Sequence, residues 1–569
     1  MAHDTMPQVS RRKFLAGSSV AALTIAAASL SGCSQSLAPT KGGESNKANS
    51  SVEEFNKHSM AYESPHETIA SDKFSESGLY VPEFLKAPDK ISNISETKEY
   101  DIVVIGAGAA GIPCALAAQQ AGAKVCLLQK EKSAVSQGNS GSGVIYERSD
   151  PQAVEALIQI IQKGNTHRSN RKLVEKWAKN SGEAINWLIG EAEKAGAQIK
   201  NQGSGPQHLT ELNGGHVEFV TSFFGPKPYD TGSGMRDLAK YLEKEGVEIF
   251  YNTPGVQLAK EGDKVVGVIA HDKEADKYIQ FNGTKGVVLA CGDYQNDEQM
   301  VRFYVPDIMN FDRKQLNKTG DGHKMGLWAG GVIEPLNHTK MLHDFDAGPA
   351  SMCDFPFLVV NEEGERFVNE ETQMSLMNNY TRQEKRTGWY SQIFDSKYME
   401  ETVGWPGKAV NPKDLEVWMP DVDMKERPAV FGDLVRTFRC DTLEELADKL
   451  EIPKDAFVTT VKRYNEIVKS GVDEDFGKDS KFLTTVDTPP YYGIHRHLRV
   501  SAVCSGLVIN EDYQVLNKLE GEPIEGLYAI GNNNAGFYGG VDYPLDVFGL
   551  SLGRCYTEGY LVGKALAAK

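Results

Sequence analysis

The sequence predicts an α/β fold that is built on a dinucleotide-binding βαβ unit. Asp101 to Ile105 is a short β-branched apolar run, typical of a buried strand, and it ends in the glycine-rich turn 106–111. Small residues then continue at helical spacing to Gln120, and a second apolar strand follows at 124–128. A strand, a tight glycine turn, a helix and a second strand in this order are typical of a doubly wound sheet. The alternative is a tight turn with only a structural role.

Each glycine of this turn has a separate physical role. Gly106 makes the tight turn, Gly108 lets backbone N–H groups approach a pyrophosphate, and Gly111 lets the helix pack closely on the strand. With Ala109 and Ala110 they begin a helix, whose unpaired N–H groups favour an anion. The sequence therefore predicts a nucleotide diphosphate at this helix N-terminus.

Three further stretches near this unit suit a nucleotide. Gln129 ends the second strand, where such folds usually carry an acidic residue for the ribose hydroxyls, and an amide can also hydrogen-bond a hydroxyl. Residues 133–143 are so rich in glycine and serine that we expect an irregular loop with donors for an anion, or a merely flexible one. The strand at 284–290 ends in Ala290 and Gly292, which let a flat ligand approach the backbone.

Length, charge and cysteine spacing exclude several classes of function. The 569 residues leave room for two or more domains, and a net charge of −17 argues against nucleic acid or an anionic membrane surface as partner. The eight cysteines form no CxxC pair and no CxxCH haem attachment. We therefore expect no metal site, no covalent haem and no iron–sulfur cluster.

The N-terminus has the pattern of an export signal. Ser10 to Leu15 is a twin-arginine pattern, and it precedes a modestly apolar run at 16–30 that is too short for a confident membrane span. Leu30 to Cys33 looks like a bacterial lipobox, whose processing would leave a lipid-modified Cys33. We expect 1–33 to be the signal, 34–97 a flexible tether, and the protein to lie in the periplasm or on the outer face of the cytoplasmic membrane. The alternative is a chance Arg-Arg before an apolar helix.

Five motifs in order make the chain similar to a known superfamily. They are GAGAAG at 106–111, GNSGSG at 138–143, KGVVLACGDY at 285–294, TGDGHKM at 319–325 and GLYAIGN at 526–532. This order resembles the fumarate reductase/succinate dehydrogenase flavoproteins, which include urocanate reductases and 3-ketosteroid dehydrogenases. The resemblance implies FAD as cofactor, and a Rossmann-like FAD-binding domain with an inserted α+β capping domain.

The same resemblance implies domain limits and cofactor contacts. The FAD-binding domain would span 98–337 and 489–569, and the cap 338–488, with a strand–turn–strand hairpin at 357–370. The chain departs from the family's pattern at Cys291, Asp293 and Asn532. The expected cofactor-binding residues are Gly106, Gly108, Ala109, Ala110, Gly111, Gln129, Lys130, Gly138, Asn139, Ser140, Gly143, Val256, Ala290, Gly292, Asp321, Asn532, Ser551 and Leu552. The last two should begin a helix whose N–H groups face the flavin.

The residues with which fumarate reductases hold a dicarboxylate are missing. The donor arginine's place falls near Met399, the substrate histidine's place near Ala502, and the substrate arginine's segment is replaced by 539–544. Two carboxylates need fixed cationic partners. Fumarate is therefore not the expected substrate.

The C-terminal segment instead resembles the Tyr-Pro segment of ketosteroid dehydrogenases, whose tyrosine polarises a substrate carbonyl. Tyr543 would take that role, because a neutral phenol can donate a hydrogen bond to an enolate oxygen. The alternative is a packed aromatic beside a rigid proline turn, and Val547 stands where the family has a second donor glycine. Further candidates for proton delivery or anchoring, each with a salt bridge, hinge or cofactor contact as alternative, are Arg499, Arg382, His343, Tyr492 and Arg554.

These features together predict an exported FAD-dependent reductase. It would transfer hydride from FAD N5 to a C=C bond conjugated to a carbonyl, in anaerobic respiration. No second GxGxxG follows the first, so we expect electrons from a redox protein such as a membrane cytochrome c and not from NAD(P)H. Two alternatives stay open: a 3-ketosteroid-type 1,2-dehydrogenase with an external acceptor, and a tethered flavoprotein for electron transfer or binding.

Overall fold

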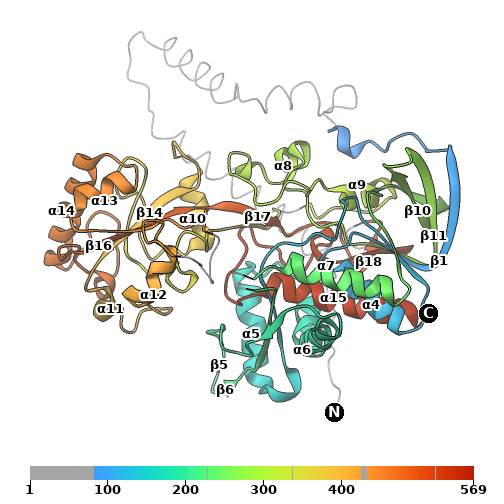
Figure 1. Cartoon of the computed structure of the whole chain (residues 1–569), viewed down its shortest axis with the longest axis horizontal. Helices are drawn as coiled ribbons and strands as arrows, with labels where there is room; N and C mark the ends of the chain where they lie inside the picture. The colour runs from blue at the N-terminus through green and yellow to red at the C-terminus, as the bar shows by residue number, and fades with distance from the viewer. Residues whose placement is uncertain (1–81, 227–228, 336, 383, 425–431, 519–520) are drawn as a thin grey trace, which may run out of the picture. The chain divides into compact units, whose positions relative to one another are not determined.

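A computed structural model describes residues 82–569, apart from 227–228, 336, 383, 425–431 and 519–520 (Figure 1). The predicted signal, Cys33 and most of the predicted tether lie outside the described residues. Within the part of the chain that is described, no helix is both long and apolar enough to cross a membrane.

The central sheet confirms the predicted α/β class. Its strands follow the order β18-β19-β11-β1-β2-β8, and those from β19 to β8 run parallel. Strands β9 and β10 add an antiparallel extension beside β11. The bounds are β1 Ile94–Ile105, β2 Val125–Leu128, β8 Glu248–Phe250, β9 Gly255–Glu261, β10 Lys264–Asp272, β11 Lys277–Leu289, β18 Gln514–Leu516 and β19 Pro523–Ala529.

Helices cover this sheet, and Figure 1 shows α4, α7 and α15 side by side against it. Helix α15 packs closely on α4 because its glycines have no side chains: a Cβ at Gly559 would lie 2.3 Å from the Ala110 carbonyl oxygen, and one at Gly563 would lie 2.3 Å from that of Cys114. The helices of this domain are α4 Gly111–Gln120, α5 Pro151–Gly164, α6 Arg171–Lys194, α7 Thr231–Lys244, α8 Glu298–Tyr304, α9 Asp321–Trp328 and α15 Leu550–Ala567.

The sequence was misleading at the glycine- and serine-rich stretch 133–143. We expected an irregular loop, but its end forms strand β3 (Ser140–Val144), which pairs with β7 (Phe219–Phe224). The glycines serve close packing, because a Cβ at Gly141 would lie 2.2 Å from the Tyr556 ring and one at Gly143 would lie 2.6 Å from Ser181 Cβ. The smaller strands nearby are β4 Ile199–Asn201, β5 Glu211–Leu212 and β6 Gly215–His216.

Two ordered elements lie inside the segment expected to be a tether. Strand β1 begins at Ile94, which pairs with Tyr278. A short 3₁₀ turn, η1 (Glu83–Leu85), buries Phe84 against Phe303 and Tyr304. The globular part therefore includes residues from Pro82 onward.

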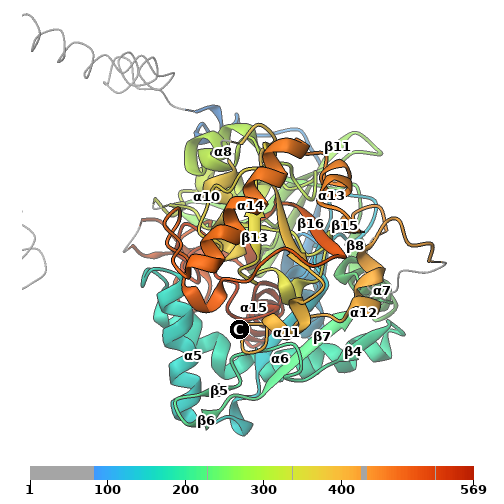
Figure 2. The same cartoon turned by 90° about the vertical axis from the view of Figure 1, so that its left-hand side faces the viewer.

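The cap has its own sheet, of order β13-β14-β16-β15, and Figure 2 shows α13 and α14 packed against it. We expected the cap to end at 488, but β16 extends its sheet to His497. A two-stranded ribbon, β12 with β17, joins the cap to the other domain. The bounds are β12 Lys340–His343, β13 Leu358–Val360, β14 Trp389–Asp395, β15 Thr437–Cys440, β16 Tyr491–His497, β17 Arg499–Val503, α10 Met374–Thr381, α11 Tyr398–Glu401, α12 Pro412–Leu415, α13 Leu443–Lys449 and α14 Lys454–Ser470.

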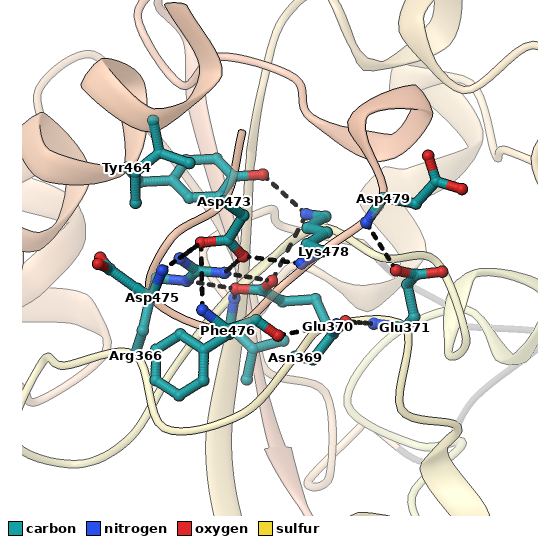
Figure 3. A network of polar contacts seen from close by, with 12 residues as sticks. Arg366, Asn369, Glu370, Glu371, Tyr464, Asp473, Asp475, Phe476, Lys478 and Asp479 are labelled. Atoms are coloured by element: carbon teal, nitrogen blue, oxygen red, sulfur yellow. Dashed lines mark hydrogen bonds and ion pairs between the residues drawn. The ribbon is translucent and has the colours of Figure 1, made fainter. Parts of the chain in front are cut away.

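The predicted hairpin at 357–370 is only half present. Strand β13 and the glycine turn form, but residues 365–370 are not a strand, and β13 pairs with β14 instead. Figure 3 shows why: Arg366 makes paired hydrogen bonds with the carboxylates of Glu370 and Asp473, at 2.8–3.0 Å, and Lys478 lies 3.7 Å from Glu370. These side chains are almost fully buried, so the ion cluster fixes the backbone in place of a sheet ladder.

Candidate functional site

Several of the predicted cofactor-binding residues gather at one edge of the central sheet. Strands β1, β2, β11 and β19 are parallel, so their carboxyl ends meet at the same edge. Three of these ends are directly followed by the glycine turn 106–111, Gln129 and Ala290. The short turn η7 (Gly531–Asn533) follows the fourth after one intervening residue. The first turn of α15 lies in the same region, so five segments that are distant in the sequence meet there.

The glycine turn is shaped for close backbone approach. Gly106 has a φ of 111°, and a Cβ there would lie 2.3 Å from the Ala290 carbonyl oxygen. A Cβ at Gly111 would lie 1.9 Å from the Gly106 carbonyl oxygen. Helix α4 begins here without a side-chain cap, although the Ile112 N–H already donates to the Gly108 carbonyl at 3.0 Å. Such a cradle fits a diphosphate.

The end of β2 carries Gln129, which was expected at the ribose, and Lys130, which was expected to contact the cofactor. Gln129 is buried, and its side-chain oxygen accepts a hydrogen bond from the Glu131 N–H at 3.3 Å. Lys130 donates to Thr319 at 2.7 Å and to the carboxylate of Asp321, the first residue of α9, at 2.9 Å. A cavity of about 640 Å³ opens beside Lys130 and Thr319. Lys130 is therefore held by Asp321 at the rim of an open space.

The turn η7 was only partly anticipated. Asn532 accepts a hydrogen bond from buried Arg554 at 2.7 Å. Asn533, which the sequence did not single out, accepts from the Cys291 N–H at 2.6 Å and donates to the Gly292 carbonyl at 2.9 Å, which ties β19 to β11. Glu558 accepts from the Gly531 N–H at 2.6 Å. Three consecutive asparagines after a buried strand were the available signal.

Helix α15 brings Ser551 and Leu552 to the same region, as predicted. It begins at Leu550 without a side-chain cap, and a Cβ at Gly138 would lie 2.9 Å from Leu552. Asn139 is exposed beside Ser140, whereas Gly143 packs on α6 and Val256 is half-buried in β9. The uncapped starts of α4 and α15 and the glycine cradle between them fit a dinucleotide cofactor.

Tyr543 lies buried next to the start of α15. Its ring centre is 5.0 Å from that of Tyr538, and Arg554 lies 5.0 Å from the Tyr538 ring centre. Burial raises the pKa of the Tyr543 hydroxyl, although the backbone of Ser551 opposes the rise. A phenol is already protonated at physiological pH, and burial makes its ionisation still less favourable, so Tyr543 can act as a hydrogen-bond donor.

His343 and Arg499 form a second cluster on the ribbon β12–β17. Lys314 lies 3.3 Å from His343 Nδ1, Ser501 lies 3.1 Å from His343 Nε2, and Arg499 pairs with Asp346 at 2.8 Å. Burial and the neighbouring cations Lys314 and Arg499 lower the pKa of His343 well below its usual value. The imidazole is neutral at physiological pH, and Lys314 leaves its proton on Nε2, directed at Ser501.

The other catalytic candidates lie elsewhere. Arg382 is exposed at the carboxyl end of α10, so it is not part of either cluster. Tyr492 is a core residue of the cap that stacks on Phe394 at 5.2 Å. Arg382 followed the cap signature in the sequence, but it lies directly after the buried last residue of α10, at a position that is exposed.

Comparison with known proteins identifies what this chain resembles. A family model described as the FAD binding domain matches residues 101–543. The vinyl phenol reductase of Lactiplantibacillus plantarum is 26% identical over 517 residues, which cover 83% of this chain and 97% of that protein. A probable fumarate reductase of Shewanella frigidimarina is 27% identical over 470 residues, which cover 78% and 71%. The open conformation of a flavocytochrome c3 fumarate reductase has the same fold, with a TM-score of 0.62, 24% identity, and coverage of 84% and 79%.

The cradle makes a prediction about cofactor loading. Replacing Gly111 by alanine places a methyl group against the Gly106 carbonyl, so we expect purified G111A to lose most of its flavin absorbance relative to protein. The matched control is G190A, in α6, where a Cβ meets nothing within 4 Å, and which should keep a wild-type flavin ratio. Wild-type flavin content in G111A would contradict the assignment of this turn.

Proposed function

The chain belongs to the FAD binding domain family, and from this premise we propose that it is an exported reductase that saturates a C=C bond conjugated to a carbonyl. FAD is its cofactor, and it is an oxidoreductase that acts on CH–CH groups. The observation that carries the proposal is the buried, protonated Tyr543 beside the start of α15. Bound FAD supplies or accepts the hydride.

Tyr543 would hold the developing negative charge of the substrate. Reduction of a conjugated alkene at its β-carbon moves charge onto the carbonyl oxygen, and a fixed donor in a buried site stabilises that charge. Because burial raises the pKa of Tyr543, the hydroxyl donates without losing its proton. Its position next to the uncapped start of α15 adds a favourable helix dipole.

Proton delivery to the α-carbon would fall to the second cluster. His343 presents its Nε2 proton to Ser501, and Arg499 and Lys314 supply fixed positive charge beside it. His343, Arg499 and Ser501 lie on the ribbon that joins cap and FAD-binding domain, and β17 ends at Val503, directly before Cys504. Cys504 in turn contributes to the raised pKa of Tyr543, which links the two clusters along one strand.

The proposed substrate class rests on two observations: the missing dicarboxylate-binding residues and the activities named for the relatives. The dicarboxylate-binding residues of fumarate reductases are absent from the sequence, so fumarate is not the proposed substrate. The relative named vinyl phenol reductase adds alkenes conjugated to a phenol, whose oxygen would meet the same donor. The reversed reaction, a 1,2-dehydrogenation of a keto-steroid-like substrate, is the second candidate, because it also needs a tyrosine at this position.

The proposal is tested with purified holoenzyme, reduced methyl viologen and a panel of enones, enoates and vinyl phenols. We expect oxidation of the dye with at least one substrate other than fumarate. Faster turnover of the saturated compounds with phenazine dyes would instead establish the dehydrogenase. If no substrate is turned over with either dye, the remaining interpretation is a flavoprotein for electron transfer or binding.

The role of Tyr543 predicts a selective loss of activity. On the best panel substrate, Y543F should lower kcat/KM by about 10²–10³-fold, because it removes a donor to the developing charge. The control Y390F removes another buried tyrosine hydroxyl, in cap strand β14, and should change kcat/KM less than about threefold. Equal effects in the two variants would remove Tyr543 from the reaction.

Export and electron supply complete the proposal. The twin-arginine pattern supports transport of a folded, FAD-loaded protein to the periplasm, and the lipobox supports an anchor at Cys33. A membrane cytochrome c would then supply electrons for anaerobic respiration.

Replacing Arg11 and Arg12 by lysine should leave the precursor in the cytoplasm, and C33S should release the protein from membranes. Normal export of the lysine variant, seen by cell fractionation, would refute this route.

A further inference from the structure

Asp542, directly before Tyr543, is held by two different parts of the molecule. Its Oδ1 accepts a hydrogen bond from Asn378 at 2.8 Å and lies 3.0 Å from the ammonium of Lys340. Its Oδ2 accepts from Asn379 at 3.0 Å. Asn378 and Asn379 belong to cap helix α10, whereas Lys340 begins strand β12. A single carboxylate therefore connects the cap, the ribbon and the tyrosine segment.

The backbone on both sides of Asp542 is fixed to the same strand. The Lys340 N–H donates to the Val541 carbonyl at 3.0 Å, and the Tyr543 N–H donates to the Lys340 carbonyl at 2.9 Å. The side chain of Lys340 is fully buried, and its ammonium lies 2.7 Å from Asp307 as well. The position of Tyr543 thus depends on the register between residues 541–543 and Lys340, which the carboxylate of Asp542 stabilises.

The donor set explains why an acid is needed here. Two amide N–H groups and an ammonium converge on Asp542, and a carboxylate offers only acceptors. An asparagine in its place can still accept from Asn378 and Lys340, but its own NH₂ group then faces the NH₂ group of Asn379. The surroundings of residue 542 therefore require a hydrogen-bond acceptor at both Oδ positions.

We propose that Asp542 is a positioning residue that couples the position of cap helix α10 to that of Tyr543. The inference rests on the proposed role of Tyr543. When α10 is in place, Asn378 and Asn379 hold Asp542, and the tyrosine segment stays in register with β12. When α10 moves away, the carboxylate loses two of its three partners, and Tyr543 loses its fixed position. Tyr543 is therefore positioned to donate to the developing charge only when α10 is in contact with Asp542.

The test is a swap between Asp542 and Asn379. D542N brings two NH₂ groups together, and N379D brings two carboxylates together, so each single variant should break the contact. The double variant D542N/N379D restores a hydrogen bond with donor and acceptor reversed, while Lys340 keeps Asp307 as its counter-ion. The control N201D adds the same charge to an exposed residue of strand β4, far from this contact in sequence.

The first readout is hydrogen–deuterium exchange of the FAD-loaded protein. In both single variants, amides of 374–381 and of 540–547 should exchange about tenfold faster, whereas β13 should keep its wild-type rate. The swap should return both segments to within about threefold of wild type, and N201D should change neither. Faster exchange in only one segment, or a swap that restores nothing, would overturn the coupling.

The second readout separates positioning from stability. With the best panel substrate, the single variants should lower kcat by about 10–100-fold, which is the effect of misplacing a catalytic group, and the swap should recover most of it. An unchanged kcat with a lowered Tm would show that Asp542 only stabilises the fold. If no substrate of the panel is turned over, the proposed function fails, but the exchange experiment still decides the coupling.

Discussion

The close approach of three backbones at the end of β1 is the constraint on which the rest of the cofactor site depends. Gly106 lies against the Ala290 carbonyl, Gly111 against Gly106, and Gly559 of α15 against Ala110. No side chain fits at any of these contacts. Strands β1 and β11 and helices α4 and α15 are therefore locked in mutual position by the absence of Cβ atoms. The uncapped helix starts converge as a consequence, and the anion site needs no charged side chain.

The cap follows a different physical rule. Its segment after β13 is held by buried charges, with Arg366 between Glu370 and Asp473. Arg366 also lies 4.7 Å from the Phe476 ring centre. Breaking such a pair leaves an uncompensated buried charge, which costs about 3–5 kcal/mol. The ion cluster therefore gives the inserted domain a rigid frame of its own, next to a ribbon that is only two strands wide.

The parts of the fold that could be predicted were those in which the local sequence pattern reflects the backbone conformation. The end of strand β1, the glycine turn and α4 follow from periodicity and glycine spacing, the start of α15 was expected from the family resemblance, and the parallel sheet then determines which segments meet. Strand β3 could not be predicted, because its glycines serve helix packing that is visible only once Tyr556 and Ser181 are in place. The second strand of the cap hairpin failed for a similar reason, since Asp473 lies more than a hundred residues from its partner Arg366.

The residues proposed to act on the substrate are harder to predict because their surroundings depend on partners far away in the sequence. Arg382 and Arg499 looked equivalent as isolated cations, yet one is exposed and the other is paired with Asp346 beside Lys314 and His343. Burial raises the pKa of Tyr543 above its ordinary value, and the Tyr543 backbone is held by Lys340, some two hundred residues earlier. The cradle expected to bind FAD therefore depends on local glycine geometry, whereas the position of Tyr543 depends on long-range contacts with β12 and α10. Under the proposed coupling, a movement of α10 would therefore change the position of Tyr543 and leave the glycine contacts of the FAD cradle unchanged.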